Sequence, residues 1–220
     1  MSLDFKANGF EIVENKIRLN AKEIEYLKYS IKQAKNEDFG IETVLKIICW
    51  EDSKVSNSIL SKIIKITSKV TRIDEKTLNE NFSKDVYYTE QSKASKNRNQ
   101  YPHFDWMPKI KAFLYLSENS NNDRGSIFFA KSSHKSIYMK IIKFIRNFST
   151  PGYNYKRPPI FFKRFVKGLS FTEANARKFS LVIFDTDTIH HSGIVKLKDF
   201  TRIVLRFDFN NSMDNKRKIL

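Results

Sequence analysis

The spacing of apolar residues predicts helices in the first third of the chain. A short, weakly alternating segment at 9–17 suits a strand. The next segment, 21–35, repeats its apolar residues at helical spacing behind Asn20, which can cap the first turn. A second segment at 57–70 has the same period and a wider apolar face. Each helix therefore needs a surface on which to bury one side.

From about residue 85 the pattern changes to short apolar or alternating runs, rich in β-branched and aromatic residues. Turn-like spacers separate these runs, as is typical of an antiparallel sandwich or barrel. The expected fold class is therefore mainly β with flanking helices. The predicted strands are 86–90, 110–116, 126–130, 180–186 and 202–209.

The predicted elements suggest a single domain, 1–220, with an internal insertion. Residues 1–84 would supply the opening strand and supporting helices, and 85–130 and 179–210 the main strands. Between them, 131–178 forms an insertion that begins with a helix at 136–148 and continues as a loop at 149–159.

Composition fits a folded protein, since hydrophobic residues make up 40% of the 220 residues and aromatic residues 14%. Cys49 is the single cysteine, which excludes an intramolecular disulfide and a cysteine-based zinc site. No run of about 18 apolar residues occurs, so no membrane span is expected. We expect a cytoplasmic protein.

The chain carries 40 Lys and Arg against 24 Asp and Glu, a formal charge of +16. Such an excess attracts anions, nucleic acid included, although an AT-rich coding bias towards lysine would give the same balance. The charge is concentrated between Asp123 and Glu173, where no other acidic residue occurs and aromatic residues alternate with lysines and arginines. We therefore expect an anionic substrate, small or polymeric, with Lys163 and Arg164 as candidate contacts. The alternative is a solvated helix face.

Candidate metal ligands lie in two segments. In YPHFDW, His103 and Asp105 are two apart and would share one face of an extended chain. His190, at the end of the strand in FDTDTIHH, could complete a face of two histidines and one carboxylate. Such a face leaves coordination positions open for a 2-oxo acid and dioxygen. The alternative for the first pair is a surface loop.

A strand with two unlike faces follows. In TRIVLRFDF, Ile203, Leu205, Phe207 and Phe209 alternate with Arg202, Val204 and Arg206, which predicts an apolar back and an arginine-bearing front. Arg202 lies twelve residues after His190 and could bind a carboxylate with two parallel hydrogen bonds. Arg206, on the same face, is a further candidate for an anionic substrate. The alternative is a solvated face of an edge strand.

These motifs, in this order, resemble the phytanoyl-CoA dioxygenase family of 2-oxoglutarate oxygenases. The similar segments run through most of the chain: GFEIVENKI before a helix, HFDW, IKAFLYLSENSNNDRGSIFFAKSSHK, FDTDTIHHSG and TRIVLRF. The resemblance implies a double-stranded β-helix (jelly-roll, cupin-like) core that uses Fe(II), 2-oxoglutarate and O2.

The resemblance also implies roles for residues. It assigns His103, Asp105 and His190 to iron, and Arg202, with Ser192 as a weaker candidate, to 2-oxoglutarate. It makes His134 structural, and strand alternation favours His190 over His191 as the distal ligand. The carboxylate, which related halogenases lack, favours hydroxylation with release of succinate and CO2.

Two positions depart from the family's pattern. ARKFS, 176–180, replaces a Gly-Asp turn, and Ser132 stands where the family has glycine. Two other functions remain open at this point. One is a non-catalytic jelly-roll module that binds nucleic acid, and the other is a cupin-like metal enzyme that does not use 2-oxoglutarate.

Overall fold

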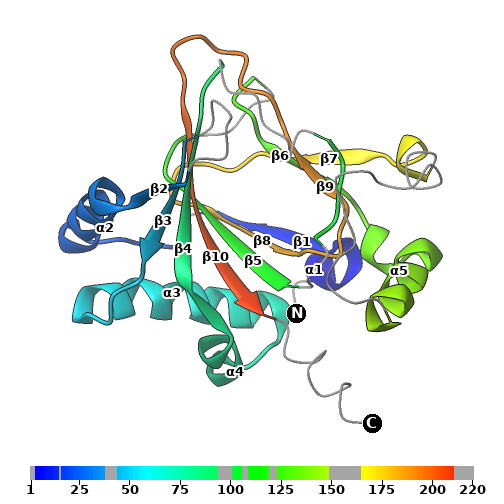
Figure 1. Ribbon diagram of the computed structural model, residues 1–220, viewed down its shortest axis with the longest axis horizontal. Coiled ribbons are helices and arrows are strands. Elements are labelled where there is room, and N and C mark those ends of the chain that lie inside the picture. The colour runs from blue at the N-terminus through cyan, green and yellow to red at the C-terminus, as the bar shows by residue number, and fades with distance from the viewer. Residues whose placement is uncertain are drawn as a thin grey trace.

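Two antiparallel sheets face one another, and helices cover the outer face of the larger sheet (Figure 1). The computed structural model describes residues 3–14, 16–37, 44–93, 101–105, 109–118, 123–148 and 165–210. Within them the arrangement is a jelly-roll core with flanking helices, so the predicted fold class is confirmed.

Within the described residues the larger sheet has seven strands in the order β1-β8-β5-β10-β4-β3-β2. Every pairing is antiparallel. The strands are β1 (Phe10–Val13), β2 (Lys35–Glu37), β3 (Val44–Cys49), β4 (Phe82–Gln91), β5 (Lys109–Tyr115), β8 (Leu181–Asp185) and β10 (Arg202–Asn210).

The smaller sheet has the order β7-β6-β9 and is also antiparallel. Its strands are β6 (Ile127–Ala130), β7 (Phe171–Ala174) and β9 (His190–Ser192). A 3-10 helix, Ser133–Lys135, and α5 (Ile137–Phe148) follow β6. The segment that begins β9 is the one in which the sequence analysis placed the distal ligand.

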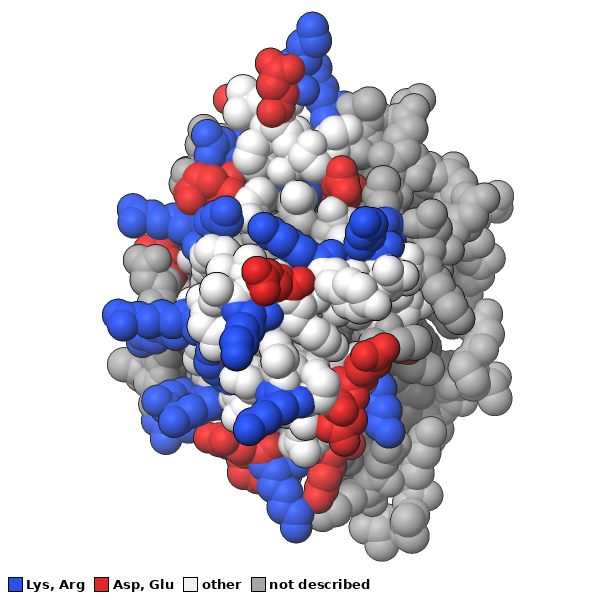
Figure 2. Space-filling model, turned by 90° about the vertical axis from the view of Figure 1, so that its left-hand side faces the viewer, with Lys and Arg blue, Asp and Glu red and all other residues white. Residues whose placement is uncertain are grey.

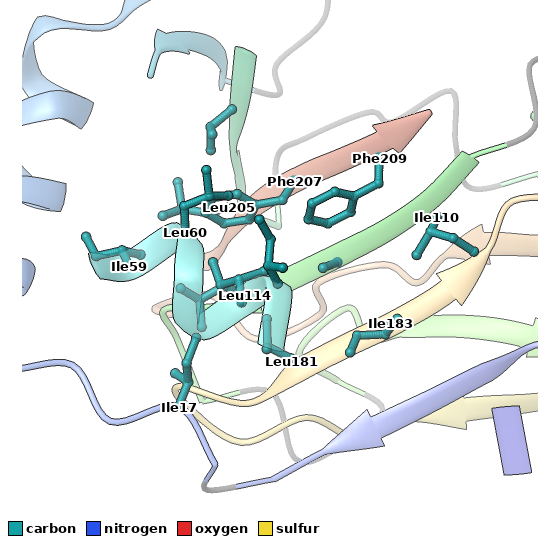
Figure 3. Packing of buried hydrophobic residues seen from close by; sticks show 14 of the residues in the cluster. Ile17, Ile59, Leu60, Ile110, Leu114, Leu181, Ile183, Leu205, Phe207 and Phe209 are labelled. Atoms are coloured by element: carbon teal, nitrogen blue, oxygen red, sulfur yellow. The ribbon is translucent and has the colours of Figure 1, made fainter. Parts of the chain in front are cut away.

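Helices α1 (Leu3–Asn8), α2 (Ala21–Gln33), α3 (Lys54–Thr71) and α4 (Glu75–Glu80) contribute to the core outside the larger sheet. Asn20 and Glu23 form a reciprocal capping box at the start of α2, as the capping prediction requires. α3 lies across the sheet and buries the apolar stripe expected of it (Figure 3). The residues labelled in Figure 3 are Ile17, Ile59, Leu60, Ile110, Leu114, Leu181, Ile183, Leu205, Phe207 and Phe209.

The period-2 alternation along each strand separates two cores. On β10, Leu205 and Phe207 face the helices, and Val204 faces the smaller sheet. Between the sheets, the Phe10 ring from β1 stacks on that of Phe129 from β6, with centroids 4.4 Å apart. The second core therefore joins the two sheets, and the arginine-bearing face of β10 belongs to this interior side, as predicted.

Several predicted boundaries were wrong. The second helix begins at Lys54 rather than 57, because Ser53 caps it. Residues 1–84 were expected to hold one opening strand and helices, but they also contain β3, which pairs with β4. The insertion was expected to be a helix and a loop, but it also contains β7, which pairs with β6. Both are short runs that a distant partner holds in place, and no local signal identifies that partner. The predicted loop at 149–159 lies outside the described residues, and the expectation of a single domain stays a prediction.

The two departures from the family's pattern both fall at left-handed backbone positions. Ser132 has φ 61° and Phe179 has φ 62°, a region that favours glycine. The Ser132 hydroxyl donates to the carbonyl of Ala7 at 2.8 Å, and Phe179 packs against the outer core. A hydrogen bond and apolar packing thus hold these two turns. Among the described helices, none is long and apolar enough to cross a membrane.

Candidate metal centre

The fold brings His103, Asp105 and His190 together. One potential ligand atom from each lies within 4.8 Å of those of the other two. The first two residues precede β5 and the third begins β9, and the backbones of the two histidines exchange hydrogen bonds. His103 N donates to His190 O at 2.9 Å, and His190 N donates to His103 O at 2.8 Å. Main-chain pairing between segments far apart in sequence thus holds the candidate ligands together.

Both imidazoles are held in the same way. Nδ1 of His103 lies 2.8 Å from the carbonyl oxygen of Tyr101, and Nδ1 of His190 lies 2.7 Å from that of Thr188. A carbonyl only accepts, so each Nδ1 carries the proton and donates it to this bond. Each Nε2 then keeps its lone pair, which is the form of histidine that binds a metal.

Burial sets the charge of the site. Burial, with the nearby charges of His103 and Lys111, lowers the pKa of His190 to about 3 against the opposing effect of Asp105. Burial alone would raise the pKa of Asp105, but Lys111 and the two histidines together hold it well below its usual range. At neutral pH the cluster is two neutral imidazoles and one carboxylate, a donor set suited to Fe(II) with positions left open.

The sequence analysis missed Lys111, whose Nζ forms an ion pair with Oδ2 of Asp105. Lys111 is buried at an interior position of β5, on the same face as Phe113 and Tyr115. A lysine that alternates with Phe113 and Tyr115 on the inward face of the strand was the available signal, because a buried ammonium needs an anionic partner.

Arg202 is buried on the interior face of β10, and burial lowers the pKa of its guanidinium. Nη1 donates to the carbonyl oxygen of Gly125, and the buried Nε has no hydrogen-bond partner. In the described part of the chain no carboxylate pairs with it. The buried hydroxyl of Tyr115 is close enough to interact electrostatically with Arg202. A buried guanidinium with an unused donor is suited to an anionic ligand.

Ser192 lies on the same wall as Arg202. Its hydroxyl is 3.4 Å from Oε1 of Gln91, and Gln91 pairs directly with Arg202 in the register of β4 and β10. Gln91 is buried and was not predicted. Gln91, Ser192 and Arg202 therefore form one polar wall on the interior side.

The other two histidines lie away from the cluster. The His191 ring stacks on that of Phe128, with centroids 4.9 Å apart and planes 3° apart, on the side of β9 opposite His190. His134 belongs to the 3-10 helix after β6, where its Nδ1 lies beside Gly9. As predicted, the side chains of His190 and His191 lie on opposite sides of β9. A structural role for His134 stays a prediction.

Of the three residues that the sequence suggested as substrate contacts, the structure describes Arg206. Arg206 lies on the interior face, where its guanidinium is 3.8 Å from the ring centroid of Tyr87 and Nε is 2.9 Å from Oδ1 of Asp208. Asp208 also pairs with Lys109 at 3.3 Å. Lys163 and Arg164 lie outside the described residues.

Solved structures with similar folds include proteins named as 2-oxoglutarate-dependent or solved with 2-oxoglutarate bound. The non-heme carbocyclase SnoK from nogalamycin biosynthesis is 9% identical (TM-score 0.66, covering 95% of this chain and 82% of its own). HygX from Streptomyces hygroscopicus, with nickel and 2-oxoglutarate bound, is 14% identical (0.60, 94% and 85%). AviO1 from Streptomyces viridochromogenes is 11% identical (0.57, 94% and 92%). No family model and no curated protein matches the sequence. At these identities the likeness establishes the fold.

Proposed function

We propose that this chain is an Fe(II)- and 2-oxoglutarate-dependent dioxygenase. The observation that carries the proposal is the pairing of two features on one interior face. A cluster of His103, Asp105 and His190 has the donor set of a two-histidine, one-carboxylate iron site. Arg202 is a buried guanidinium with a donor that no other described residue uses. Binding of 2-oxoglutarate to iron would use both features.

The residues divide into two roles. The three clustered side chains would bind iron through two Nε2 atoms and one carboxylate oxygen. Arg202, with the Ser192 hydroxyl nearby, would bind the far carboxylate of 2-oxoglutarate. When bound, iron, 2-oxoglutarate and O2 supply an oxidant for C–H bonds, with release of succinate and CO2. The protein contributes ligand geometry and the apolar surroundings that exclude water.

Hydroxylation of an anionic substrate is the finer part of the proposal. Asp105 retains the carboxylate whose loss would admit halide, which favours hydroxylation. Arg206 and Lys109 share the single carboxylate of Asp208, so one positive charge is left in excess on the interior face. Both side chains are 25% exposed, and Tyr87 stacking holds the guanidinium of Arg206 in one plane. An anionic group of the substrate is therefore expected beside Arg206.

Two other functions have less support. On the side of the molecule that carries α2, the lysines and arginines among the described residues are separated by uncharged residues and by Asp and Glu side chains, so these residues form no continuous basic surface for nucleic acid (Figure 2). A metal enzyme without 2-oxoglutarate would leave the buried Arg202 without an anionic ligand. Binding of nucleic acid without binding of Fe(II) would favour the first of these instead.

The test is succinate formation from 2-oxoglutarate after anaerobic loading with Fe(II) and exposure to O2, without an added substrate. The wild type is expected to turn over slowly, and His103→Ala and Arg202→Ala are expected to lose that activity. Tyr29→Ala, on the exposed side of α2, is the matched control and should retain it. Absence of turnover together with absence of Fe(II) binding in the wild type would contradict the proposal.

A further inference from the structure

Lys111 is the buried cation beside the proposed iron ligand Asp105. Strand register places it between Phe184 of β8 and Asp208 of β10. Asp208 is the nearer carboxylate in register, yet it pairs with Lys109 and Arg206. Lys111 instead extends to Oδ2 of Asp105, so the ion pair links the interior of the sheet to the segment that carries two proposed ligands.

The ion pair constrains how Asp105 can bind a metal. A carboxylate can bind with one oxygen or with both, and each oxygen fills one coordination position. Lys111 engages one of the two oxygens in a setting where its own side chain is 11% exposed. Burial strengthens the electrostatic attraction, because little water competes with the ammonium group.

We propose that Lys111 is a positioning residue that restricts Asp105 to one metal-binding oxygen. This keeps open a coordination position that 2-oxoglutarate needs in order to bind through two atoms. The inference rests on the proposed oxygenase function. If both oxygens of Asp105 bound the metal, 2-oxoglutarate would have to displace one of them, so its affinity would fall.

The neighbouring Lys109 provides a matched control. It lies two residues before Lys111 on the same face of β5, and its ion pair is with Asp208 at 3.3 Å rather than with a proposed ligand. Lys109→Met and Lys111→Met remove the same charge and the same length of side chain. Only the second removes a contact with Asp105.

The experiment is an anaerobic titration of the Fe(II)-loaded full chain with 2-oxoglutarate, followed by the visible charge-transfer absorption of the complex. Lys111→Met is expected to weaken 2-oxoglutarate binding by about tenfold or more, the scale of effects from residues that orient metal ligands. Lys109→Met should stay within about twofold of the wild type. Lys111→Gln, which keeps a donor but not the charge, should recover part of the loss.

Each alternative result has a defined meaning. An unchanged 2-oxoglutarate affinity in Lys111→Met, or an equal loss in Lys109→Met, would overturn the inference alone. Equal losses in Lys111→Gln and Lys111→Met would also overturn it, because they would show that Lys111 acts only through its charge. If the wild type shows no absorption with Fe(II) and 2-oxoglutarate, the proposed function fails first. Thermal unfolding of each variant identifies losses that come from misfolding.

Discussion

His103 and His190 donate backbone hydrogen bonds to each other, at 2.9 and 2.8 Å, so the main chain itself joins the two segments that carry the proposed iron ligands. The pairing also fixes which histidine faces the cluster. In β9, His190 is buried beside His103, and the next residue, His191, stacks on Phe128 on the opposite side.

We therefore expect His190→Ala and His191→Ala to differ sharply although the residues are adjacent. Loss of His190 removes a proposed ligand and should weaken Fe(II) binding by at least about a hundredfold, more than loss of a residue that only orients a ligand. Loss of His191 should leave binding within a few-fold of the wild type. Anaerobic metal titration gives both affinities, and a reversed order would show that the distal ligand is His191.

Arg202→Gln should weaken binding of 2-oxoglutarate rather than of iron. The buried guanidinium is the proposed partner of the far carboxylate, and truncating one member of a buried charge pair costs about 2–5 kcal/mol, or roughly thirtyfold and upwards. The affinity for Fe(II) alone is expected to stay unchanged. Separate titrations with metal and with 2-oxoglutarate test this split, and a variant that loses metal affinity instead would contradict the role.

Stability of the metal-free protein should depend on pH through His190. Burial holds the pKa of folded His190 at about 3, below its ordinary value of 6.5, so the unfolded chain takes up the proton first as the pH falls. The free energy of unfolding should therefore decrease as the pH falls from about 6.5 towards 4, by at most about 1.4 kcal/mol per pH unit for this group. Asp105 acts in the same sense, because its folded pKa is also lowered, but only below its ordinary value of 3.8.

Urea unfolding of the metal-free wild type and of His190→Asn at about pH 7 and about pH 5 measures this dependence. The variant lacks the titrating group and should lose less stability over the same interval. Parallel loss in both proteins would show that other groups dominate.

Gly9 should tolerate no side chain. It has φ +83°, and a Cβ there would lie 2.0 Å from Oγ1 of Thr188 and 2.6 Å from Nδ1 of His134. Gly9→Ala is therefore expected to cost about 2–4 kcal/mol of stability, from backbone strain and overpacking together. Because Thr188 also accepts the hydrogen bond from Nδ1 of His190, Fe(II) affinity should fall as well.

Gly168 offers the matched control for that change. Its φ lies outside the left-handed region, and the nearest atom to an added Cβ is the carbonyl oxygen of Phe165 at 3.6 Å. Gly168→Ala should change stability by no more than about 0.5 kcal/mol. Equal unfolding midpoints for the two variants would contradict the steric argument.

The sequence by itself determined the alternation of the strands and the residues offered to the interior. In β10 the period of two places Leu205 and Phe207 against the helices and Arg202 on the other face, whatever strand lies beside it. The same period separates His190 from His191. Asn20 likewise identifies the start of α2, because a capping box is local to one turn.

The tertiary structure alone decided which distant groups meet. Lys111 could have paired with Asp208, its neighbour in register, but pairs with Asp105. Gln91 joins the wall of Arg202 only because β4 lies beside β10. Strand alternation follows from local backbone geometry, whereas partners across a sheet depend on non-local pairing and burial, which no short stretch of sequence contains.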